Sequence, residues 1–316
     1  MSKHLVIVDG HAVAHRAYHS MPPLTVNGQP VNAIYGFYSM LLTAIDTLKP
    51  DYFLVCLDSP GPTFRQAEFL GYRAKRKPAD HDLIVQLPEL PKTLEAAQIP
   101  NFSMGGYEAD DLIATLARRS LKRKRSKSKK SIIDKVTIIT GDKDLMQLVD
   151  DKIELFMPIR GLTDTKVFGP SEVFEKLFVN PSQVVDLKAL MGDMSDSYPG
   201  VAGIGPKTAA ELLVKYGNLD TIYSHLDELS EPVRQKLTKD KDNAYLSQKL
   251  ATLIDNIPLN FTLRSARWNK KQALNMIPVF EQYHFKSLVS RINKKYNLVT
   301  KKLEVKKPDS SQASLF

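Results

Sequence analysis

Nine acidic side chains lie in short motifs that could together bind metal ions. The motifs are Val8-Asp9-Gly10, Leu57-Asp58, Glu108-Ala109-Asp110-Asp111, Asp142-Lys143-Asp144 and Asp193-Met194-Ser195-Asp196. Each motif alone has a structural explanation, because acids favour the first turn of a helix and aspartates commonly follow strands. Brought together, the carboxylates would repel one another unless cations compensated their charge. Oxygen-only ligands suit hard divalent ions, so we expect Mg²⁺ or Mn²⁺ in preference to Zn²⁺.

Divalent ions at such a site would also indicate the type of reaction that it catalyses. Two divalent ions about 3.5–4 Å apart activate a water and stabilise the attacking and leaving oxygens of a phosphoryl transfer. The chain carries 44 Lys+Arg against 35 Asp+Glu, a net charge of +9, and its pI is about 9.3. This basic excess favours a polyanionic partner such as a nucleic acid. Metal-binding acids on a basic protein therefore predict a phosphodiesterase that acts on nucleic acid.

Three histidines suggest a competing metal site. His11, His15 and His19 recur every four residues and would share one face of a helix. Zinc sites need further ligands and supporting residues, and the sequence has no other His or Cys cluster near these three. We therefore interpret them as a polar helix face near the substrate.

Two basic segments could contact phosphates. Residues 118–130 hold nine basic residues and no acid, which is too dense a charge to pack. Both a solvated loop and a DNA-backbone contact remain open for this segment. Residues 64–65 and 72–77 combine aromatic and basic side chains, as suits an unpaired strand that stacks on rings. A solvated loop is the ordinary alternative for this second segment.

A glycine-rich hairpin precedes a helix that runs to about residue 216. Its glycines would let the backbone approach a phosphate, and the first amides of the helix would bind that anion, with Lys207 adding a charge. Such a helix-hairpin-helix holds the DNA backbone without reading bases. The alternative is an ordinary glycine-rich connection between helices.

The elements that must position these residues alternate along the first half of the chain. Ligand sites of parallel sheets lie beyond the carboxyl ends of the strands, where Asp9, Asp58 and Asp142 would meet. An alternation of strands and helices is typical of an α/β fold, with a mainly parallel sheet flanked by helices. Apolar runs predict strands at 5–8, 52–57, 136–140 and 153–157, and helical patterns predict helices at 33–48, 87–97 and 107–119.

The pattern becomes helical after about residue 178. We predict an α/β metal-binding domain over 1–180, a helical DNA-binding region over 181–294 that carries the hairpin, and a flexible polar tail over 295–316. No apolar run approaches the roughly 20 residues that cross a bilayer. The single cysteine excludes a disulfide framework, and a strand at residues 4–8 leaves no room for a secretory signal. These features predict an intracellular protein.

Taken in order, the motifs resemble those of the bacterial 5′-nuclease family. This family comprises flap endonucleases and 5′→3′ exonucleases homologous to the N-terminal domain of DNA polymerase I. The similarity runs from about residue 5 to about residue 290, and it includes Tyr72-Arg73-Ala74-Lys75-Arg76 and Gly203-Ile204-Gly205-Pro206-Lys207-Thr208. It implies a PIN-like nuclease domain with a helical arch around residues 64–97, followed by a helical region with the hairpin.

The resemblance also implies a set of site residues. The metal ligands would be Asp9, Asp58, Glu108, Asp110, Asp111, Asp142, Asp144, Asp193 and Asp196. The catalytic residues would be Asp58, Asp111, Arg73 and Arg76, the two arginines stabilising the charge of the transition state. The DNA contacts would be Arg16, Phe64, Arg65, Tyr72, Arg73, Lys75, Arg76, Gly203, Gly205, Lys207 and Thr208. Backbone carbonyls between Val201 and Ile204 would bind a K⁺ ion.

Two positions depart from the family pattern. Arg73 stands where Lys is common, and an arginine keeps its charge but does not transfer a proton. This replacement is compatible with holding the scissile phosphate. Ser197 stands where Asn is usual, which leaves the local loop geometry open.

These features predict a freestanding, monomeric, Mg²⁺-dependent nuclease that removes 5′ flaps or RNA primers from branched DNA in the cytoplasm, at the nucleoid. Two or more Mg²⁺ or Mn²⁺ ions would serve the reaction. The terminal residues Gln312, Leu315 and Phe316 resemble the Gln-x-x-Leu-Phe peptide that bacterial replication proteins insert into the sliding clamp. The alternatives are a non-catalytic module that binds DNA junctions and a nuclease that acts mainly on structured RNA.

Overall fold

The computed structural model describes residues 3–122, 132–161 and 164–298. Most of the basic segment over 118–130, and the clamp-like peptide with Gln312, Leu315 and Phe316, therefore lie outside the described residues.

A six-stranded sheet forms the centre of the α/β part, in the order β5-β4-β1-β6-β7-β8. Strand β1 pairs in parallel with β4 and β6, β6 pairs in parallel with β7, and β8 runs antiparallel to β7. The predicted fold class is confirmed, as are the four predicted strands. The strands are β1 (His4–Asp9), β2 (Thr25–Val26), β3 (Gln29–Pro30), β4 (Tyr52–Cys56), β5 (Asn101–Phe102), β6 (Lys135–Ile139), β7 (Ile153–Arg160) and β8 (Asp164–Phe168).

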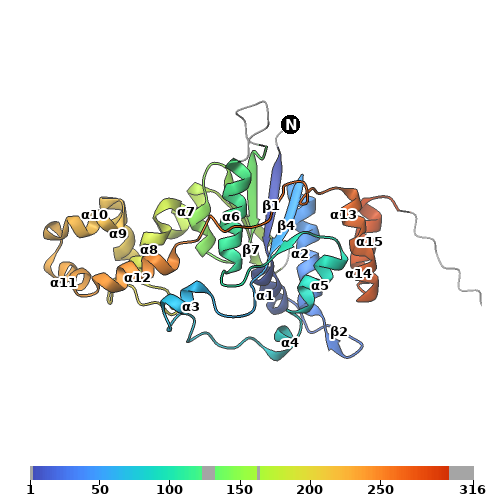
Figure 1. Cartoon of the computed structure of the whole chain (residues 1–316), viewed down its shortest axis with the longest axis horizontal. Coiled ribbons are helices and arrows are strands. Elements are labelled where there is room, and N and C mark those ends of the chain that lie inside the picture. Colours follow the sequence, from blue (N-terminus) through green and yellow to red (C-terminus); the bar gives the residue numbers. More distant parts are fainter. Residues whose placement is uncertain (1–2, 123–131, 162–163, 299–316) are drawn as a thin grey trace, which may run out of the picture.

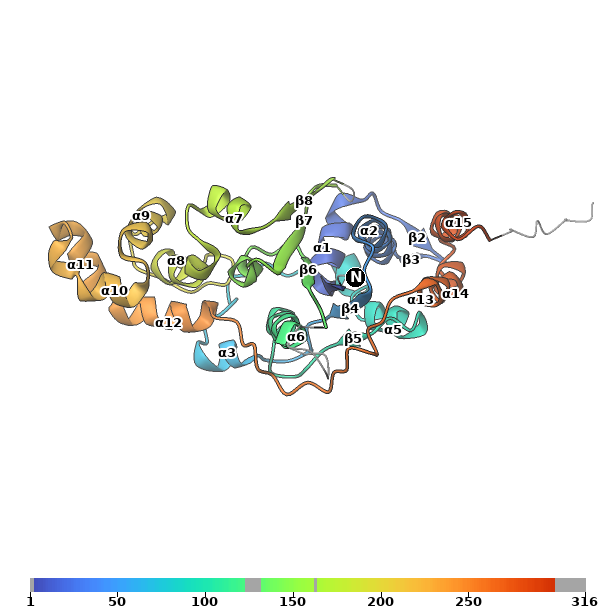
Figure 2. The same ribbon diagram turned by 90° about the horizontal axis from the view of Figure 1, so that it is seen from above.

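Helices cover both faces of the sheet, with α6 on one face and α1 and α2 on the other (Figure 2). The three helices predicted from the sequence are confirmed as α2, α5 and α6. The α-helices are α1 (Gly10–Ser20), α2 (Asn32–Leu48), α3 (Phe64–Glu68), α4 (His81–Ile84), α5 (Glu89–Ala96), α6 (Ala109–Lys122), α7 (Pro170–Leu177), α8 (Val184–Met191), α9 (Pro206–Tyr216), α10 (Leu219–Ser224), α11 (Glu231–Lys239), α12 (Lys241–Ala251), α13 (Lys270–Leu274), α14 (Met276–Gln282) and α15 (Lys286–Lys295). The 3-10 helices are η1 (Asp144–Leu148), η2 (Pro181–Gln183) and η3 (Leu226–Glu228).

Alternate residues of each central strand pack on opposite faces. Leu5 and Ile7 of β1 join the core under α6, whereas Val6 and Val8 join the core under α1 and α2. A strand that is buried on both faces needs apolar residues at nearly every position. This need explains why the central strands are visible as apolar runs in the sequence.

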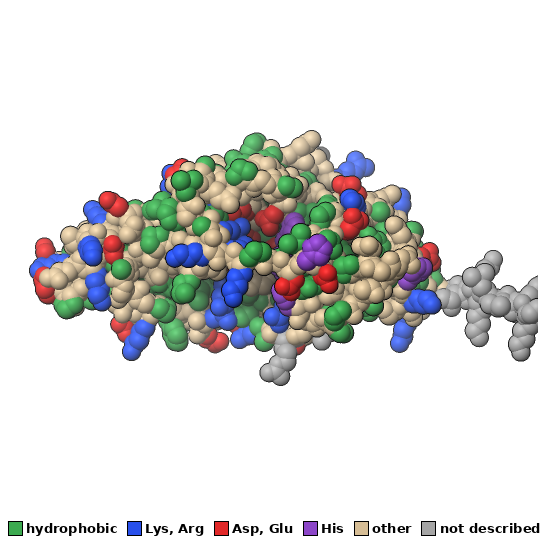
Figure 3. All heavy atoms as spheres, turned by 90° about the horizontal axis from the view of Figure 1, so that it is seen from below, with side chains coloured by type: hydrophobic (Ala, Val, Ile, Leu, Met, Phe, Trp, Pro, Cys, Tyr) green, Lys and Arg blue, Asp and Glu red, His purple; other side chains and the backbone are tan. Residues whose placement is uncertain are grey.

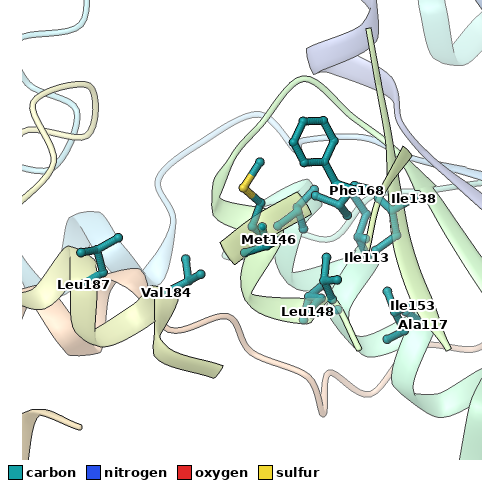
Figure 4. Packing of buried hydrophobic residues seen from close by; sticks show 14 of the residues in the cluster. Ile113, Ala117, Ile138, Met146, Leu148, Ile153, Phe168, Val184 and Leu187 are labelled. Carbon is teal, nitrogen blue, oxygen red and sulfur yellow. The ribbon is translucent and has the colours of Figure 1, made fainter. Parts of the chain in front are cut away.

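The core under α6 continues into the helical region. Side chains from η1 lie between the sheet and helix α8, so the two parts share buried contacts (Figure 4). The labelled members of this core are Ile113, Ala117, Ile138, Met146, Leu148, Ile153, Phe168, Val184 and Leu187. Helix α8 is therefore fixed against the element that carries Asp144.

The helices of the second half lie at two ends of the molecule. Helices α7 to α12 extend from one side of the sheet, whereas α13 to α15 lie at the other end (Figure 1). Phe280 of α14 packs on Tyr38 of α2 with ring centroids 5.0 Å apart, and Arg291 of α15 pairs with Asp46 of α2. The single helical region expected over 181–294 is thus divided, because the last helices bury their apolar faces against the α/β part.

The segment around 64–97, expected as a helical arch, is only partly helical. Two short helices, α3 and α4, are joined by a chain of turns before α5 begins. Throughout the part of the chain that the structure describes, no helix has both the length and the apolar character needed to cross a bilayer.

Candidate active site

Four of the nine predicted ligands line one cavity at the carboxyl end of the sheet. They follow β1, β4 and β6 or begin α6, as the parallel topology requires. The cavity has a volume of about 180 Å³ and is lined by Asp9, His11, Ala12, His15, Asp58, Arg73, Arg76, Ala109, Asp110 and Asp142. Figure 3 shows a face of the molecule on which acidic and histidine side chains surround a hollow beside Lys and Arg side chains.

Backbone and hydroxyl donors fix the cavity carboxylates. Asp9 caps helix α1, since its Oδ1 accepts from the Ala12 amide at 3.1 Å and its Oδ2 accepts from the Thr140 hydroxyl at 2.7 Å. The Thr140 hydroxyl in turn accepts from the Asp142 amide at 2.9 Å, which joins the ends of β1 and β6. Asp58 accepts from the Ala109 amide at 2.8 Å, which joins the end of β4 to the start of α6.

The histidines of α1 lie at this cavity. Nδ1 of His11 accepts a hydrogen bond from the Asp58 amide at 3.0 Å, so the proton of a neutral ring sits on Nε2. Burial lowers the pKa of both His11 and His15 below the usual value, and the rings are neutral at pH 7. Both residues line the cavity, whereas His19 is exposed and does not. The predicted polar helix face is therefore present for two of the three histidines.

The cavity carboxylates carry more negative charge than the protein compensates. Burial is the main reason that the pKa of Asp9 is raised to about 7. Repulsion from Asp58 and Asp142 acts in the same direction, and the hydrogen bond from Thr140 acts against it. Burial, Asp142 and Asp9 also hold the pKa of Asp110 well above its usual range. Within the described residues, no Lys or Arg forms a salt bridge with any of these four carboxylates. Hard oxygen donors with uncompensated charge fit a divalent cation.

The four carboxylates surround the cavity without converging on one point. Among residues 3–122, 132–161 and 164–298, no three His, Cys, Asp or Glu side chains stand close enough to enclose a single ion. The fit to a metal therefore rests on the chemistry and charge of the donors.

A second pair of predicted ligands is held by a lysine. Lys188 of α8 donates to Asp193 Oδ2 at 2.6 Å and to Asp144 Oδ1. The other oxygen of Asp193 accepts from the Ser195 amide at 2.7 Å and the Asp196 amide at 3.1 Å. Neither Asp144 nor Asp193 lines the cavity.

The loop that carries Asp193 depends on two glycines. Gly192 and Gly200 both adopt positive φ angles, and a Cβ atom added to Gly200 would lie 2.1 Å from the Gly192 amide nitrogen. This close backbone approach lets Asp193 and Tyr198 pair in a bridge of two backbone hydrogen bonds at 3.0 and 3.1 Å. The loop therefore returns tightly enough to bring Asp193 and Asp196 to the site.

The remaining acids are neutralised by arginines. Arg73 donates to Asp196 at 3.0 Å and lies 3.1 Å from Glu108, and it also lines the cavity. The hydroxyl of Tyr72 lies 3.1 Å from an oxygen of Glu108 and 3.1 Å from an oxygen of Asp196, so its one hydrogen is shared between the two carboxylates. Burial raises the pKa of Glu108, although Arg73 and Arg65 oppose that effect. Glu108 and Asp196 thus orient Arg73 beside the cavity.

Asp111 and Arg65 do not lie where the resemblance implied. Asp111 has no exposed surface, and its two oxygens accept from the Arg65 guanidinium at 2.8 Å each. Arg65 is 2% exposed and also donates to the carbonyls of Leu250 and Thr252. The two side chains pair with each other in the interior, so Asp111 does not line the cavity and Arg65 does not face solvent. This geometry does not support the expected metal-ligand and catalytic roles of Asp111 or the expected DNA contact of Arg65, because both side chains are buried in the pair.

The other predicted DNA contacts are distributed around the cavity. Tyr72 is also buried, so its expected contact with DNA is replaced by its hydrogen bonds to the carboxylates. Arg76 and Lys75 are exposed, and Phe64 is half-buried under the Arg65 guanidinium. Arg16 donates to the Ile159 carbonyl at 2.8 Å, which ties α1 to β7.

The hairpin before α9 presents exposed residues. Gly203, Gly205 and Lys207 are exposed and Thr208 is half-buried, so the first turn of α9 is open to a ligand. The Lys236 ammonium donates to the Gly203 carbonyl at 3.1 Å. The side chains of Val201 and Ile204 are buried, and the Val201 carbonyl accepts from the Ile204 amide at 3.0 Å.

Sequence reasoning missed two polar residues of the site. A lysine within a helix usually belongs to a solvated face, so Lys188 gave no signal. Thr140 directly follows β6, and its sequence pattern indicates only the end of a strand. Both residues are recognisable once the fold brings their partners together.

Profiles of one protein family match both parts of the chain. The profile described as "5'-3' exonuclease, N-terminal resolvase-like domain" matches residues 4–178. The profile described as "5'-3' exonuclease, C-terminal SAM fold" matches residues 179–274.

Curated relatives include bacterial DNA polymerases I. The polymerase of Caldicellulosiruptor bescii is 39% identical over 294 residues, which cover 91% of this chain and 33% of that protein. The polymerase of Bacillus subtilis is 35% identical over 292 residues, which cover 92% of this chain and 32% of that protein. The chain thus spans about a third of the length of these relatives.

Solved structures share the fold at low sequence identity. The T5 5'-exonuclease with bound zinc ions has a TM-score of 0.63 and 22% identity, and the match covers 92% of this chain and 99% of that one. The catalytic core of Rad2 in complex with a DNA substrate has a TM-score of 0.56 and 16% identity, and covers 93% and 92%. These likenesses extend over both the sheet and the helical region.

Proposed function

The chain belongs to the 5'-3' exonuclease family, and on that premise we propose that it is a metal-dependent 5′ nuclease that hydrolyses phosphodiester bonds of branched DNA. One observation carries the proposal. Four carboxylates without a Lys or Arg partner among the described residues line a cavity that also contains Arg73 and Arg76. Uncompensated oxygens would hold cations, and the arginines would hold a phosphate at the same place.

The substrate would be DNA with a 5′ end or flap, including RNA primers at such ends. Rad2 and the bacteriophage T5 flap endonuclease, which share the fold, are solved in complexes with DNA. The exposed hairpin before α9 supports a contact with the duplex backbone. This division would place cleavage at the cavity and duplex binding at the hairpin.

The residues around the cavity would have different roles in catalysis. Asp9, Asp58, Asp110 and Asp142 would hold Mg²⁺ or Mn²⁺, the ions that hard carboxylate oxygens favour. Such ions, when bound, supply Lewis-acid activation of water and stabilise the charge on the phosphate oxygens. Arg73, held in place by Glu108 and Asp196, would orient the scissile phosphate, and its lasting charge would stabilise the transition state. Arg76, which is exposed, would contact the same strand.

A duplex with a fluorescent 5′ flap tests the proposal. Mg²⁺ should support cleavage and EDTA should abolish it. Asp58→Asn and Asp142→Asn should each lower kcat by at least about 100-fold, while flap binding in Ca²⁺ is retained. Asp151→Asn changes an exposed acid at the opposite, amino end of β7, and it should cleave at the wild-type rate. Normal turnover by either cavity variant would refute the assignment.

The same substrates separate the competing functions. A module that only binds junctions would bind the flap with Mg²⁺ present and leave it intact. A nuclease for structured RNA would prefer an RNA flap to a DNA flap of the same sequence.

Two further partners belong to the proposal. K⁺ would bind the carbonyls between Val201 and Ile204, and K⁺ but not Li⁺ should then strengthen duplex binding. The sliding clamp would bind Gln312, Leu315 and Phe316, which lie outside the described residues. Deleting the last two residues should weaken clamp binding and leave cleavage without the clamp unchanged. The corresponding location is the cytoplasm, at the nucleoid.

A further inference from the structure

Lys188 is a buried cation placed between two acidic side chains of the site. Its side chain comes from α8, and its ammonium donates to Asp193 Oδ2 at 2.6 Å and to Asp144 Oδ1. It is 9% exposed. A divalent ion shared by these two carboxylates would need the oxygens that the ammonium now occupies.

The pairing occupies oxygens of both carboxylates. The Lys188 ammonium donates to Asp193 Oδ2 at 2.6 Å and to Asp144 Oδ1. The other oxygen of Asp193 accepts from the Ser195 and Asp196 amides. Both oxygens of Asp193 therefore have donors in the metal-free protein.

One lysine is shared by two carboxylates. Among the described residues, Lys188 is the only Lys or Arg that pairs with Asp144 or Asp193. Tyr198, whose backbone pairs with that of Asp193, has a buried hydroxyl without a hydrogen-bond partner in the described part of the chain. Two carboxylates that share one cation, and an unused hydroxyl, leave a place for a further cation in competition with the lysine.

The cavity differs from this pair in that its carboxylates have no protein cation beside them in the described part of the chain. No Lys or Arg in the described ranges pairs with Asp9, Asp58, Asp110 or Asp142, so an ion entering the cavity displaces no protein cation. An ion entering between Asp144 and Asp193 must displace an ammonium. Since the ammonium is a compact charge on a flexible four-carbon chain, it can move aside without unfolding α8.

We infer that Lys188 is a positioning residue that competes with the second divalent ion and makes that ion bind more weakly than the first. The inference deepens the proposed function and rests on it. Lys188 keeps Asp144 and Asp193 together before the ion arrives, and it must leave them when the ion binds. The state of the second position is then set by the metal concentration.

Calorimetric titration of the full-length protein with Ca²⁺ tests the inference without any cleavage. The wild type should show a tight step and a weak step. Lys188→Met removes the competitor and should tighten the weak step by at least about 10-fold, with the tight step unchanged. Lys188→Arg keeps a charged competitor and should behave like the wild type. A purely structural lysine would lower stability on replacement and would not tighten any metal-binding step.

A second measurement uses the wild type and does not depend on how Lys188→Met folds. The ammonium signal of Lys188 in NMR spectra, assigned by its loss in Lys188→Arg, should shift during the weak Ca²⁺ step and not during the tight step. An ammonium signal that ignores the weak step, or equal isotherms for Lys188→Met and wild type, would overturn the inference. Absence of any Ca²⁺ binding would instead refute the proposed metal site itself.

Discussion

The nine acidic residues that the sequence singled out are chemically alike, and the fold gives them different roles through the cations beside them. Four line a cavity without a Lys or Arg partner in the described part of the chain. Asp144 and Asp193 share a lysine, and the other three pair with Arg65 or Arg73. At the scale of single residues, the counter-ion therefore indicates the role of each acid better than its motif does.

The pair between Arg65 and Asp111 gives the first prediction. Breaking a buried ion pair leaves one charge unpaired in the interior, so Arg65→Met and Asp111→Asn should each lower the free energy of unfolding by about 3–5 kcal/mol. The double variant Arg65→Met/Asp111→Leu should lose less than the sum of the two, since no charge is then stranded. Urea denaturation measures all three.

An exposed pair serves as the control for this prediction. Lys249 pairs with Glu68 at the surface, and Lys249→Met should change the free energy of unfolding by less than about 1 kcal/mol. If the buried and the exposed replacements lowered the free energy of unfolding equally, the Arg65 pair would not be buried as the 2% exposure of Arg65 indicates.

Ser197 gives a prediction of the opposite sign. Its φ is 63°, a left-handed conformation that Asn tolerates better than Ser and that β-branched residues resist. Ser197→Asn should stabilise the protein by about 0.5 kcal/mol, and Ser197→Val should destabilise it by about 1 kcal/mol or more. Thermal unfolding in EDTA gives the melting temperatures of the wild type and the two variants. A higher melting temperature for Ser197→Val than for Ser197→Asn would contradict the argument from the backbone conformation.

At the scale of elements, strands that are buried on both faces can be recognised in the sequence, whereas a strand that is exposed along one edge cannot. The strands β1, β4 and β6 are continuous apolar runs because two layers of helices cover them. Three of the five residues of the edge strand β8 are exposed and one more is half-buried, so its pattern resembles that of a loop. The position of the cavity follows from strand ends alone and was predictable.

What could not be predicted are contacts between distant elements. The partner of Asp111 lies on α3, and the two carbonyls that complete the Arg65 site come from the last turn of α12 and the residue after it, more than 180 residues later. The partner of Asp193 lies on α8, a helix whose composition shows no reason to bury a lysine. Sequence spacing carries no information on such pairs because tertiary packing decides them.

The buried carboxylates of the site predict that stability depends on pH. The pKa values of Asp9 and Asp144 are about 7 in the folded protein, against an ordinary 3.8. The folded state then binds more protons than the unfolded state between about pH 4 and pH 7. Without metal, the free energy of unfolding should therefore fall as the pH rises through this window, by about 1.4 kcal/mol for each pH unit that separates the two pKa values of one group.

Urea denaturation in EDTA at pH 5 and pH 8 measures this fall. His11 and His15, whose pKa values are lowered, act in the opposite direction below about pH 6.5. Comparison with Asp9→Asn cancels their effect and should show a smaller difference between the two pH values. Addition of Ca²⁺ at pH 8 should recover the lost stability, because the ion stabilises ionised carboxylates. Equal slopes for wild type and Asp9→Asn would contradict the prediction.

At the scale of the whole molecule, the proposed contacts lie on two parts of the chain. The cavity lies at the carboxyl end of the sheet. The hairpin precedes α9, in the helical region that extends from one side of the sheet (Figure 1). One duplex that reached both would contact phosphates at two separate places. Such contacts release counter-ions independently, so their effects on the salt dependence of binding should add.

This arrangement gives the last prediction. Flap binding in Ca²⁺ should weaken steeply with salt, and Arg76→Ala and Lys207→Ala should each reduce the slope of log K against log salt by about 0.9, the value for one phosphate contact. The double variant should lose about twice that amount. Lys152→Ala also removes one positive charge, but Lys152 precedes β7 at the amino end of the sheet, away from the cavity, and its slope should equal that of the wild type. If all three replacements reduced the slope equally, the net charge of +9 would act as a diffuse field, and the paired contacts would not be needed to explain binding.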